Sequence, residues 1–148
     1  MGRVQRQITL NAPVSEVFGY IPNLPRHSEW AANPLKIEQT SGGPVQAGAT
    51  FSSEGKVFGK TFRDQLTVAE YVPDSRLVLD VVGGGSRFRL SFTTEAEGDG
   101  TRLAKASETL RIPFLFKLFW PLIEKLLAPR QFAKDLKRIK ARLETDQT

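Results

Sequence analysis

The sequence contains no cysteine and only one histidine among its 148 residues. Without cysteine there can be no disulfides, thiolate metal sites or cysteine nucleophiles, and a single imidazole argues against a zinc site. We therefore expect neither a metal nor another cofactor. The chain also lacks the GxSxG, HExxH and P-loop signatures, and it has no GxGxxG between a strand and a helix. No catalytic motif assigns a reaction to this protein.

An uninterrupted apolar run long enough to cross a membrane is absent as well. The richest apolar stretch is residues 112–129, IPFLFKLFWPLIEKLLAP, which Lys117, Glu124 and Lys125 interrupt. A spanning helix needs about 20 predominantly apolar residues, so we expect a core helix or the wall of a binding site. The first ten residues, MGRVQRQITL, carry charges where a secretory signal needs an apolar run, which predicts a cytoplasmic protein.

Acidic residues are scarce near the C-terminus. The net charge is +5, and residues 125–142 hold seven basic side chains against a single acid, Asp135. Cations near the end of a helix interact favourably with its dipole, so we expect mainly a solvated helix face. Contact with nucleic acid or an anionic membrane is the alternative. We expect no nucleic-acid partner.

The order of elements predicts one domain over residues 1–148. A strand at 4–10 is followed by a short helix, for which Asn11 is a candidate cap and Pro13 suits the first turn. A second short helical segment, NLPRHSEW, covers residues 23–30. From Thr50 onward, EGK, VPDSR, VGGGS and EGDGT separate short strands at intervals of roughly ten residues, which is typical of an antiparallel meander.

Alternation within the strands indicates which side chains face inward. Phe88, Leu90 and Phe92 share one face of their strand. In RLAKASETL, residues 102–110, the face with Ala106 and Glu108 has small side chains that would leave room for a ligand. Asp64 is in step with the apolar residues of its own strand.

Two apolar stripes predict a long C-terminal helix with a kink. At about 100° per residue, the stripe after Pro129 is rotated from the stripe before it. Proline disrupts the preceding turn, so a kink at Pro129 would bring both stripes onto one surface. The stripe before Pro129 consists of Leu115, Leu118, Phe119, Leu122, Ile123 and Leu126, and the stripe after it of Phe132, Leu136, Ile139 and Leu143.

This order resembles the START-like superfamily, which includes the Bet v 1 allergens and the polyketide cyclase/dehydratase-like proteins. The segments that carry the resemblance are ITLNAPVSEVFGYIPNLPRHSEW, AGATF, VAEYVPDSRLVL and GDGTRLAKASETL. It implies an α+β helix-grip fold, in which a curved antiparallel sheet of six or seven strands surrounds a long C-terminal helix, with two short helices after the first strand. It also implies an interior cavity for a small apolar or amphipathic molecule.

The resemblance and the alternation together select candidate site residues. His27 is a candidate general base or hydrogen-bond partner, although a polar residue on a surface helix is the competing interpretation. Asp64 and Glu108 are candidate acids with raised pKa, unless a neighbouring arginine pairs with them. Phe58, at an expected hairpin tip, is a candidate gate over the cavity or a contact for a partner. The expected ligand-binding residues are Trp30, Phe51, Phe62, Phe88, Leu90, Phe92, Ala106, Glu108, Phe119, Trp120 and Ile123, with ordinary core packing as the alternative for the aromatic ones.

These observations favour a protein that binds a small hydrophobic or amphipathic ligand, such as a lipid, a polyketide or an isoprenoid-like molecule. The first alternative is a cyclase or dehydratase in which His27 or a cavity acid transfers protons. The second alternative is an interaction module that uses the basic helix face. Fold does not decide among them, and the chain is expected to be a monomer or a homodimer.

Overall fold

The computed structural model describes residues 3–22, 36–57 and 59–145. Within these residues, seven strands form one antiparallel sheet in the order β1-β7-β6-β5-β4-β3-β2. The strands are β1 (Arg3–Leu10), β2 (Lys36–Gln39), β3 (Thr50–Val57), β4 (Lys60–Val72), β5 (Arg76–Gly83), β6 (Ser86–Glu97) and β7 (Gly100–Arg111). The helical segments are α1 (Val14–Tyr20), the 3-10 helix η2 (Phe114–Phe116), α2 (Trp120–Leu122), the π-helical η3 (Ile123–Leu127) and α3 (Ala128–Thr145).

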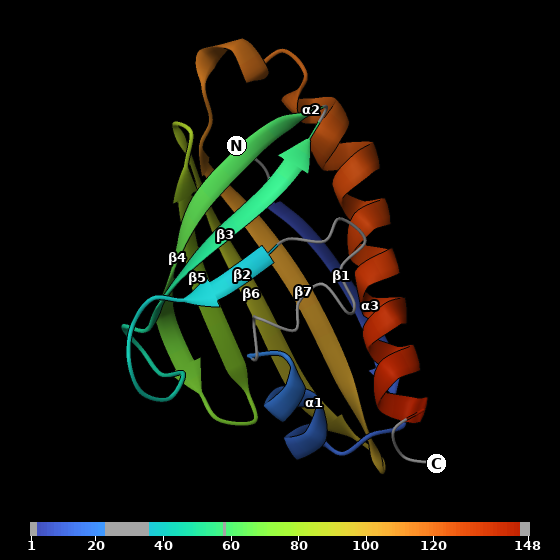
Figure 1. Ribbon diagram of the computed structural model, residues 1–148. Helices are drawn as coiled ribbons and strands as arrows, with labels where there is room; N and C mark the ends of the chain where they lie inside the picture. Colours follow the sequence, from blue (N-terminus) through green and yellow to red (C-terminus); the bar gives the residue numbers. More distant parts are fainter. Residues whose placement is uncertain (1–2, 23–35, 58, 146–148) are drawn as a thin grey trace.

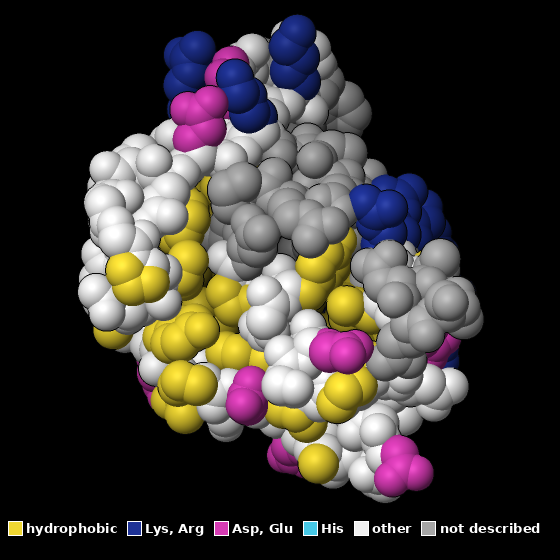
Figure 2. Space-filling view, turned by 60° about the horizontal axis from the view of Figure 1, so that its bottom comes forward, with side chains coloured by type: hydrophobic (Ala, Val, Ile, Leu, Met, Phe, Trp, Pro, Cys, Tyr) yellow, Lys and Arg dark blue, Asp and Glu magenta, His cyan; other side chains and the backbone are white. Residues whose placement is uncertain are grey.

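The sheet curves around one side of α3, and α1 and α2 lie at opposite ends of the molecule (Figure 1). This arrangement confirms the predicted helix-grip fold and the predicted antiparallel meander. The second short helix, expected at residues 23–30, lies outside the described residues. From the end that carries α1, hydrophobic side chains gather across the middle of the molecular face, and charged side chains lie mainly at its margins (Figure 2).

Local sequence explains the turns of the meander. Gly84 and Gly85 form the β5–β6 turn with φ of 56° and 81°, a left-handed conformation that favours glycine. Asp74 adopts φ of 59° in the β4–β5 turn, where aspartate is tolerated better than most residues. The first helix starts differently from the prediction. Its N-cap is Pro13 without a side-chain cap, and Asn11 instead donates its backbone N–H to the Glu144 carboxylate at 3.0 Å.

The core lies between the concave face of the sheet and the two helices α1 and α3. Its largest fully buried side chains are Phe51, Phe92, Leu10, Ile21, Leu77, Leu79, Leu103, Leu136, Ile139 and Val17. The predicted stripe after Pro129 is confirmed, because Phe132, Leu136, Ile139 and Leu143 are all buried on α3. Two hydrogen bonds hold the C-terminal half of α3 near β1, from Lys140 Nζ to the Thr9 carbonyl and from the Asn11 N–H to Glu144.

The stripe before Pro129 departs from the prediction. Regular α-helix gives way to π-helix at η3, which ends two residues before Pro129, whose ring removes a backbone donor. The segment from η2 to η3 stands at one end of the sheet, and most of its large apolar side chains are exposed. The expectation that both stripes share one buried surface is therefore wrong.

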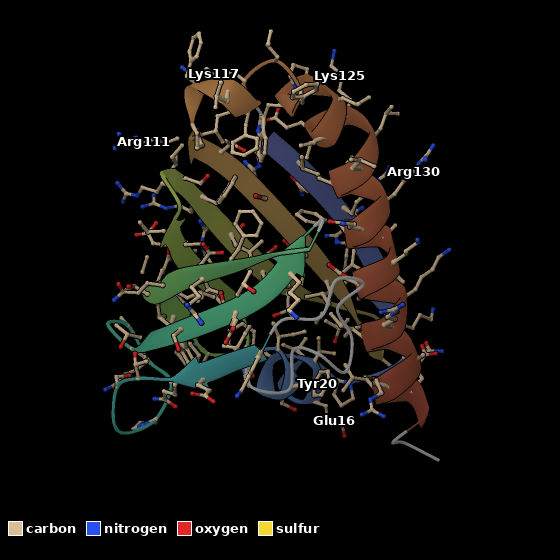
Figure 3. The ribbon with its side chains drawn as sticks, turned by 45° about the horizontal axis from the view of Figure 1, so that its top comes forward. Glu16, Tyr20, Arg111, Lys117, Lys125 and Arg130 are labelled. Carbon is tan, nitrogen blue, oxygen red and sulfur yellow. The ribbon has the colours of Figure 1, made fainter. Side chains whose placement is uncertain are left out.

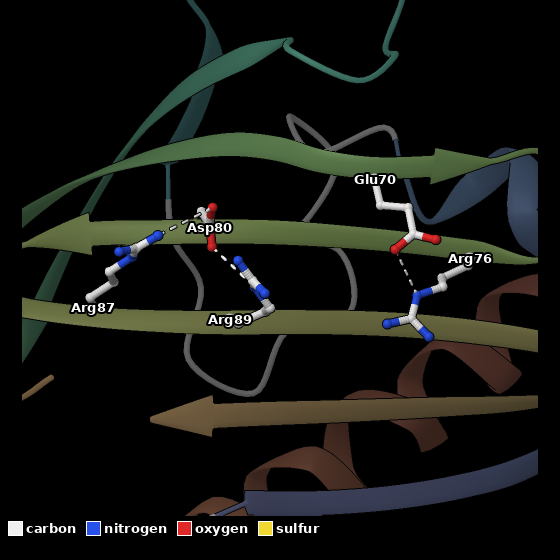
Figure 4. Close-up of polar contacts among 5 residues, drawn as sticks. All are labelled: Glu70, Arg76, Asp80, Arg87 and Arg89. Carbon is white, nitrogen blue, oxygen red and sulfur yellow. Dashed lines mark hydrogen bonds and ion pairs between the residues drawn. The ribbon is translucent and has the colours of Figure 1, made fainter. Parts of the chain in front are cut away.

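The convex face of the sheet is polar and charged. Asp80 on β5 accepts a hydrogen bond from Arg89 Nε at 3.3 Å and forms an ion pair with Arg87 at 3.7 Å (Figure 4). Arg76 forms an ion pair with Glu70 at 3.2 Å. Such partly exposed pairs contribute little each, typically about 0.2–1 kcal/mol. They identify the solvent side of the sheet, so the functional interior must be sought on the other side.

Candidate functional site

The concave face is less well covered near the β5–β6 turn than farther along these strands. Val81 and Phe88 are cross-strand partners, and Leu90 follows Phe88 on the same face of β6. All three side chains are only half-buried, whereas Leu66 and Leu79 beside them on the sheet are buried. Solvent therefore reaches an apolar patch in the interior. We call Val81, Phe88 and Leu90 the central hollow.

Trp120 closes one side of the central hollow. Its ring stacks on Phe88 with centroids 5.6 Å apart, and its Nε1–H donates to the Thr109 hydroxyl at 3.1 Å. Phe88 and Thr109 are paired across β6 and β7, so a single indole ring contacts both members of the pair. Ile123 is half-buried on the same helical segment. The hollow thus lies between the sheet and the start of the C-terminal helical region.

A buried ion pair lies beside the hollow. Lys105 Nζ on β7 contacts Asp135 Oδ2 on α3 at 2.8 Å, and each side chain is only 7% exposed. Lys105 is the cross-strand partner of Phe92, which is two residues from Leu90. Its ammonium also lies 4.4 Å from the centroid of the Phe132 ring. The pair therefore lies beside Phe92, which is the next inward-facing residue of β6 after Leu90 of the hollow.

The environment of Lys105 disfavours its charged form. Burial lowers the pKa of the Lys105 ammonium, and the contact with Asp135 opposes part of that shift. The flanking rings of Phe92 and Phe132 stabilise a cation by their negative faces but give it no hydrogen-bond acceptor. A lysine held in this way can donate a hydrogen bond to a ligand oxygen, or exchange a proton with it.

Asp64 is a second acidic group on the concave side. It pairs across the sheet with the buried Ser53, and its carboxylate occupies the space above Gly83, where any Cβ would collide with it. Burial raises the pKa of Asp64 above its ordinary value of 3.8. The predicted inward orientation of Asp64 agrees with this position, and its role in binding or proton transfer stays a prediction.

Only some of the predicted site residues lie on the concave face. Phe51, Phe88, Leu90 and Phe92 are on the concave face, with Trp120 and Ile123 at its border. Phe62 shares the face of Leu66 on β4 but is 41% exposed. His27, Trp30 and Phe58 lie outside the described residues.

The predicted orientation of β7 is wrong. Ala106 and Glu108 lie on the convex face, where they line a shallow depression with Arg3, Arg76 and Arg89. The inward face of β7 carries Leu103, Lys105 and Thr109 instead. Alternation alone favoured the alanine face because an inward lysine interrupts the apolar pattern. Phe119 is also misplaced by the prediction, since its side chain is mostly exposed.

Sequence reasoning missed Lys105 and Asp135, although a signal for Asp135 exists. Asp135 is the only acid in the basic C-terminal run, and at helical spacing it falls in phase with Phe132, Leu136 and Ile139. A carboxylate in the buried stripe of a helix requires a partner, because an isolated buried charge is costly. Lys105 is two residues from the buried Leu103 and so shares its face.

Neither a metal site nor a membrane span is found in the described part of the chain. No three histidine, cysteine, aspartate or glutamate side chains there are grouped so that they could hold a metal ion. No helix among residues 3–22, 36–57 and 59–145 has the length and apolar character to cross a membrane.

Comparison with known protein families now adds to this geometry. Residues 1–144 match the family described as "Polyketide cyclase / dehydrase and lipid transport". The chain belongs to this family. A search of curated protein sequences finds no significant match.

Solved structures of family-like proteins share the fold at low sequence identity. A protein from Thermus thermophilus superposes with a TM-score of 0.81 at 18% identity, with 99% of this chain and 100% of that chain covered. The Zhui aromatase/cyclase from a Streptomyces species gives 0.75 at 14% identity, with 99% and 96% covered. A START superfamily protein from Mycobacterium smegmatis gives 0.74 at 13% identity, with 97% of each chain covered. At these identities the likeness shows the fold alone.

Proposed function

We propose that the central hollow binds a small lipophilic molecule with a polar end group. The observation that carries the proposal is the half-buried state of Val81, Phe88 and Leu90 beside the buried Leu66 and Leu79 of the same face. When a ligand covers exposed apolar surface inside a fold, the removal of that surface from water contributes favourably to the free energy of binding. The family, whose description includes lipid transport, supports the same interpretation.

The Lys105–Asp135 pair defines the end group that such a ligand should carry. An ammonium has three donors, and a carboxylate or carbonyl oxygen is a suitable acceptor for one of them. A fatty acid, an isoprenoid acid or a polyketide each combines an apolar body with such an oxygen. The ligand would place its apolar body against Leu90 and Phe88 and its oxygen toward Lys105.

A cyclase-type enzyme is the second candidate, and the same ion pair is the reason for it. A buried lysine with a lowered pKa can, as the neutral amine, take a proton from an activated carbon and return that proton to an oxygen as the ammonium. One of the structurally similar proteins is an aromatase/cyclase. Enzymatic turnover that survives loss of Asp64 and disappears with Lys105→Met, while ligand binding persists, would establish this candidate.

Binding is tested with a dansyl-labelled fatty acid and a matched pair of tryptophan variants. Val81 faces the hollow and Val82, its neighbour on β5, faces the convex side. Val81→Trp should fill the hollow and reduce the affinity for the probe at least tenfold. Val82→Trp should leave the affinity unchanged.

Ligand linkage provides an independent readout. A ligand present at 100 times its Kd stabilises the folded state by about 2.7 kcal/mol, which raises the Tm of a protein of this size by roughly 5 to 10 °C. We expect that increase in the wild type and in Val82→Trp, and none in Val81→Trp. Equal responses of the two variants would show that the probe binds elsewhere. Native mass spectrometry of the purified protein would identify a ligand retained from the cell.

A further inference from the structure

Large apolar side chains crowd the surface of the segment between β7 and α3. Eight of them, in the described part of the chain, are between 46% and 86% exposed. Elsewhere in that part, exposed apolar residues of this size occur singly, as at Val72 and Val82. We call the eight residues the apolar cap: Phe114, Leu115, Phe116, Leu118, Phe119, Leu122, Leu126 and Leu127. Patches of this kind on a protein surface mark contact with another apolar surface.

The exposure of the apolar cap follows from how its segment is attached. Trp120 holds the segment to the sheet through the ring of Phe88 and the hydroxyl of Thr109. Trp120 and Ile123 are the residues of α2 and η3 that turn their apolar side chains partly inward. With the segment fixed in this orientation, Leu118 and Phe119, directly before the anchor, point to solvent.

Basic side chains surround the apolar cap. Arg111, Lys117, Lys125 and Arg130 are exposed and are spaced around the end of the molecule that carries α2 (Figure 3). Between residues 111 and 130 the sequence has these four cations and one acid, Glu124. The charge complementary to this rim is negative.

This combination identifies the partner surface. An apolar face with a cationic border is the arrangement of protein segments that lie in the interface of an anionic bilayer, with apolar groups among the acyl chains and cations at the headgroups. A second copy of the chain docked through the same face would bring two cationic rims together. Charge complementarity therefore favours the lipid surface.

We propose that the apolar cap docks this protein onto the surface of an anionic lipid bilayer. The contact is peripheral, because Phe114, Leu115 and Leu118 enter the headgroup boundary while the sheet and α3 remain outside it. Lys117 and Lys125 contact lipid phosphates. This docking goes beyond the proposed ligand binding, and it neither requires nor implies that the hollow is occupied.

Vesicle sedimentation tests the proposal. We expect the wild-type protein to sediment with vesicles of phosphatidylcholine and phosphatidylglycerol, and much less with phosphatidylcholine alone. Leu115→Glu with Leu118→Glu should reduce the binding tenfold or more, which corresponds to a loss of at least about 1.4 kcal/mol in the binding free energy. The matched control, Val72→Glu with Val82→Glu, places the same charges at exposed apolar positions outside the cap and should bind as the wild type does.

A charge-reversal comparison tests the basic rim. Lys117→Glu with Lys125→Glu should abolish the preference for phosphatidylglycerol, whereas Lys134→Glu with Lys137→Glu on α3 should retain it. Equal losses in both pairs would overturn the proposal in favour of diffuse charge attraction. Absence of vesicle binding by the wild type, or a cap-dependent dimer in its place, would also overturn it.

Failure of this proposal is distinguishable from failure of the proposed function. Binding of the dansyl fatty acid is measured without vesicles, and the Leu115 and Leu118 side chains are 78% and 86% exposed and do not line the hollow. A cap variant that keeps the probe affinity and loses the vesicles supports docking as a separate property.

Discussion

At the scale of single residues, the Lys105–Asp135 pair is the most demanding feature of the interior. Two charged groups are withdrawn from water at a cost that their attraction and their contacts offset only in good geometry. Such pairs often contribute little net stability compared with apolar residues of the same volume. We therefore propose a functional role for the pair in addition to its part in the fold.

Breaking this pair should be strongly destabilising. Asp135→Asn removes the carboxylate from a lysine enclosed by Phe92 and Phe132, and loss of one partner of a buried pair typically costs about 3–5 kcal/mol. Lys105→Met with Asp135→Leu should be close to neutral or stabilising. Urea unfolding of the variants measures both effects. A loss below about 1 kcal/mol in Asp135→Asn would contradict the buried pair.

The loss in Asp135→Asn should also depend on pH. Burial lowers the pKa of Lys105 in the folded state, and removal of Asp135 lowers it further. Between that lowered pKa and about 10.5, the unfolded chain holds a proton that the folded chain lacks, so stability rises with pH. The deficit of Asp135→Asn relative to the wild type should therefore be smaller near pH ~10 than near neutrality.

Asp64 gives a residue-scale prediction of the opposite sign. Its raised pKa means that the folded state favours the protonated acid, so stability falls as pH rises from about 3.8 through that pKa. Asp64→Asn should raise the Tm slightly at neutral pH, and the gain should vanish below pH 3.8, where the acid is protonated in both states. Asp99→Asn, in the exposed β6–β7 turn, is the control. A loss of Tm at neutral pH would show that the Asp64 carboxylate has a stabilising partner.

At the scale of elements, sequence periodicity predicted most of the strands and the buried face of α3. The phase of β6 is clear because Phe88, Leu90 and Phe92 alternate with polar residues. The phase of β7 could not be read in the same way, because its inward lysine is satisfied by Asp135, 30 positions away in the sequence. A local pattern carries no information about such a distant partner.

The apolar segment before α3 illustrates a different limit of sequence analysis. Its side chains are spaced like those of a core helix, and periodicity says which residues share a face but not what covers that face. Among the described large apolar residues of α2 and η3, only Trp120 and Ile123 turn their side chains partly inward. Phe119, directly before them, is 62% exposed. The exposure of the segment and its basic border, on which its proposed surface role rests, cannot be read from that spacing.

Trp120 should determine the attachment of this segment. Trp120→Phe keeps a ring against Phe88 but removes the Nε1–H bond to Thr109, which should cost about 1 kcal/mol. Trp120→Ala should in addition increase hydrogen exchange in residues 114–127, with little change in residues 132–143 of α3. Phe119→Ala, next in the chain and mostly exposed, should stay within about 0.5 kcal/mol of the wild type. Equal exchange in all three variants would mean that Trp120 is not the anchor.

At the scale of the whole molecule, the apolar cap and the central hollow are connected through one side chain. The indole of Trp120 contacts Phe88 in the hollow, and residues of the cap flank it on both sides in the sequence. A lipophilic ligand that leaves a bilayer at the cap would therefore need to travel only past Trp120 to reach the interior. Docking and binding, proposed from separate observations, would together form a route for ligand transfer.

Transfer of a dansyl-labelled fatty acid between donor and acceptor vesicles should report this route. The wild type should accelerate transfer, because it docks and binds. Val81→Trp should dock without accelerating transfer, since its hollow is filled. Leu115→Glu with Leu118→Glu should bind the probe in solution yet transfer it at least about tenfold more slowly, in proportion to its lost vesicle affinity. If this cap variant transferred the probe at the wild-type rate, ligand exchange would proceed through free solution, and the cap would have no part in it.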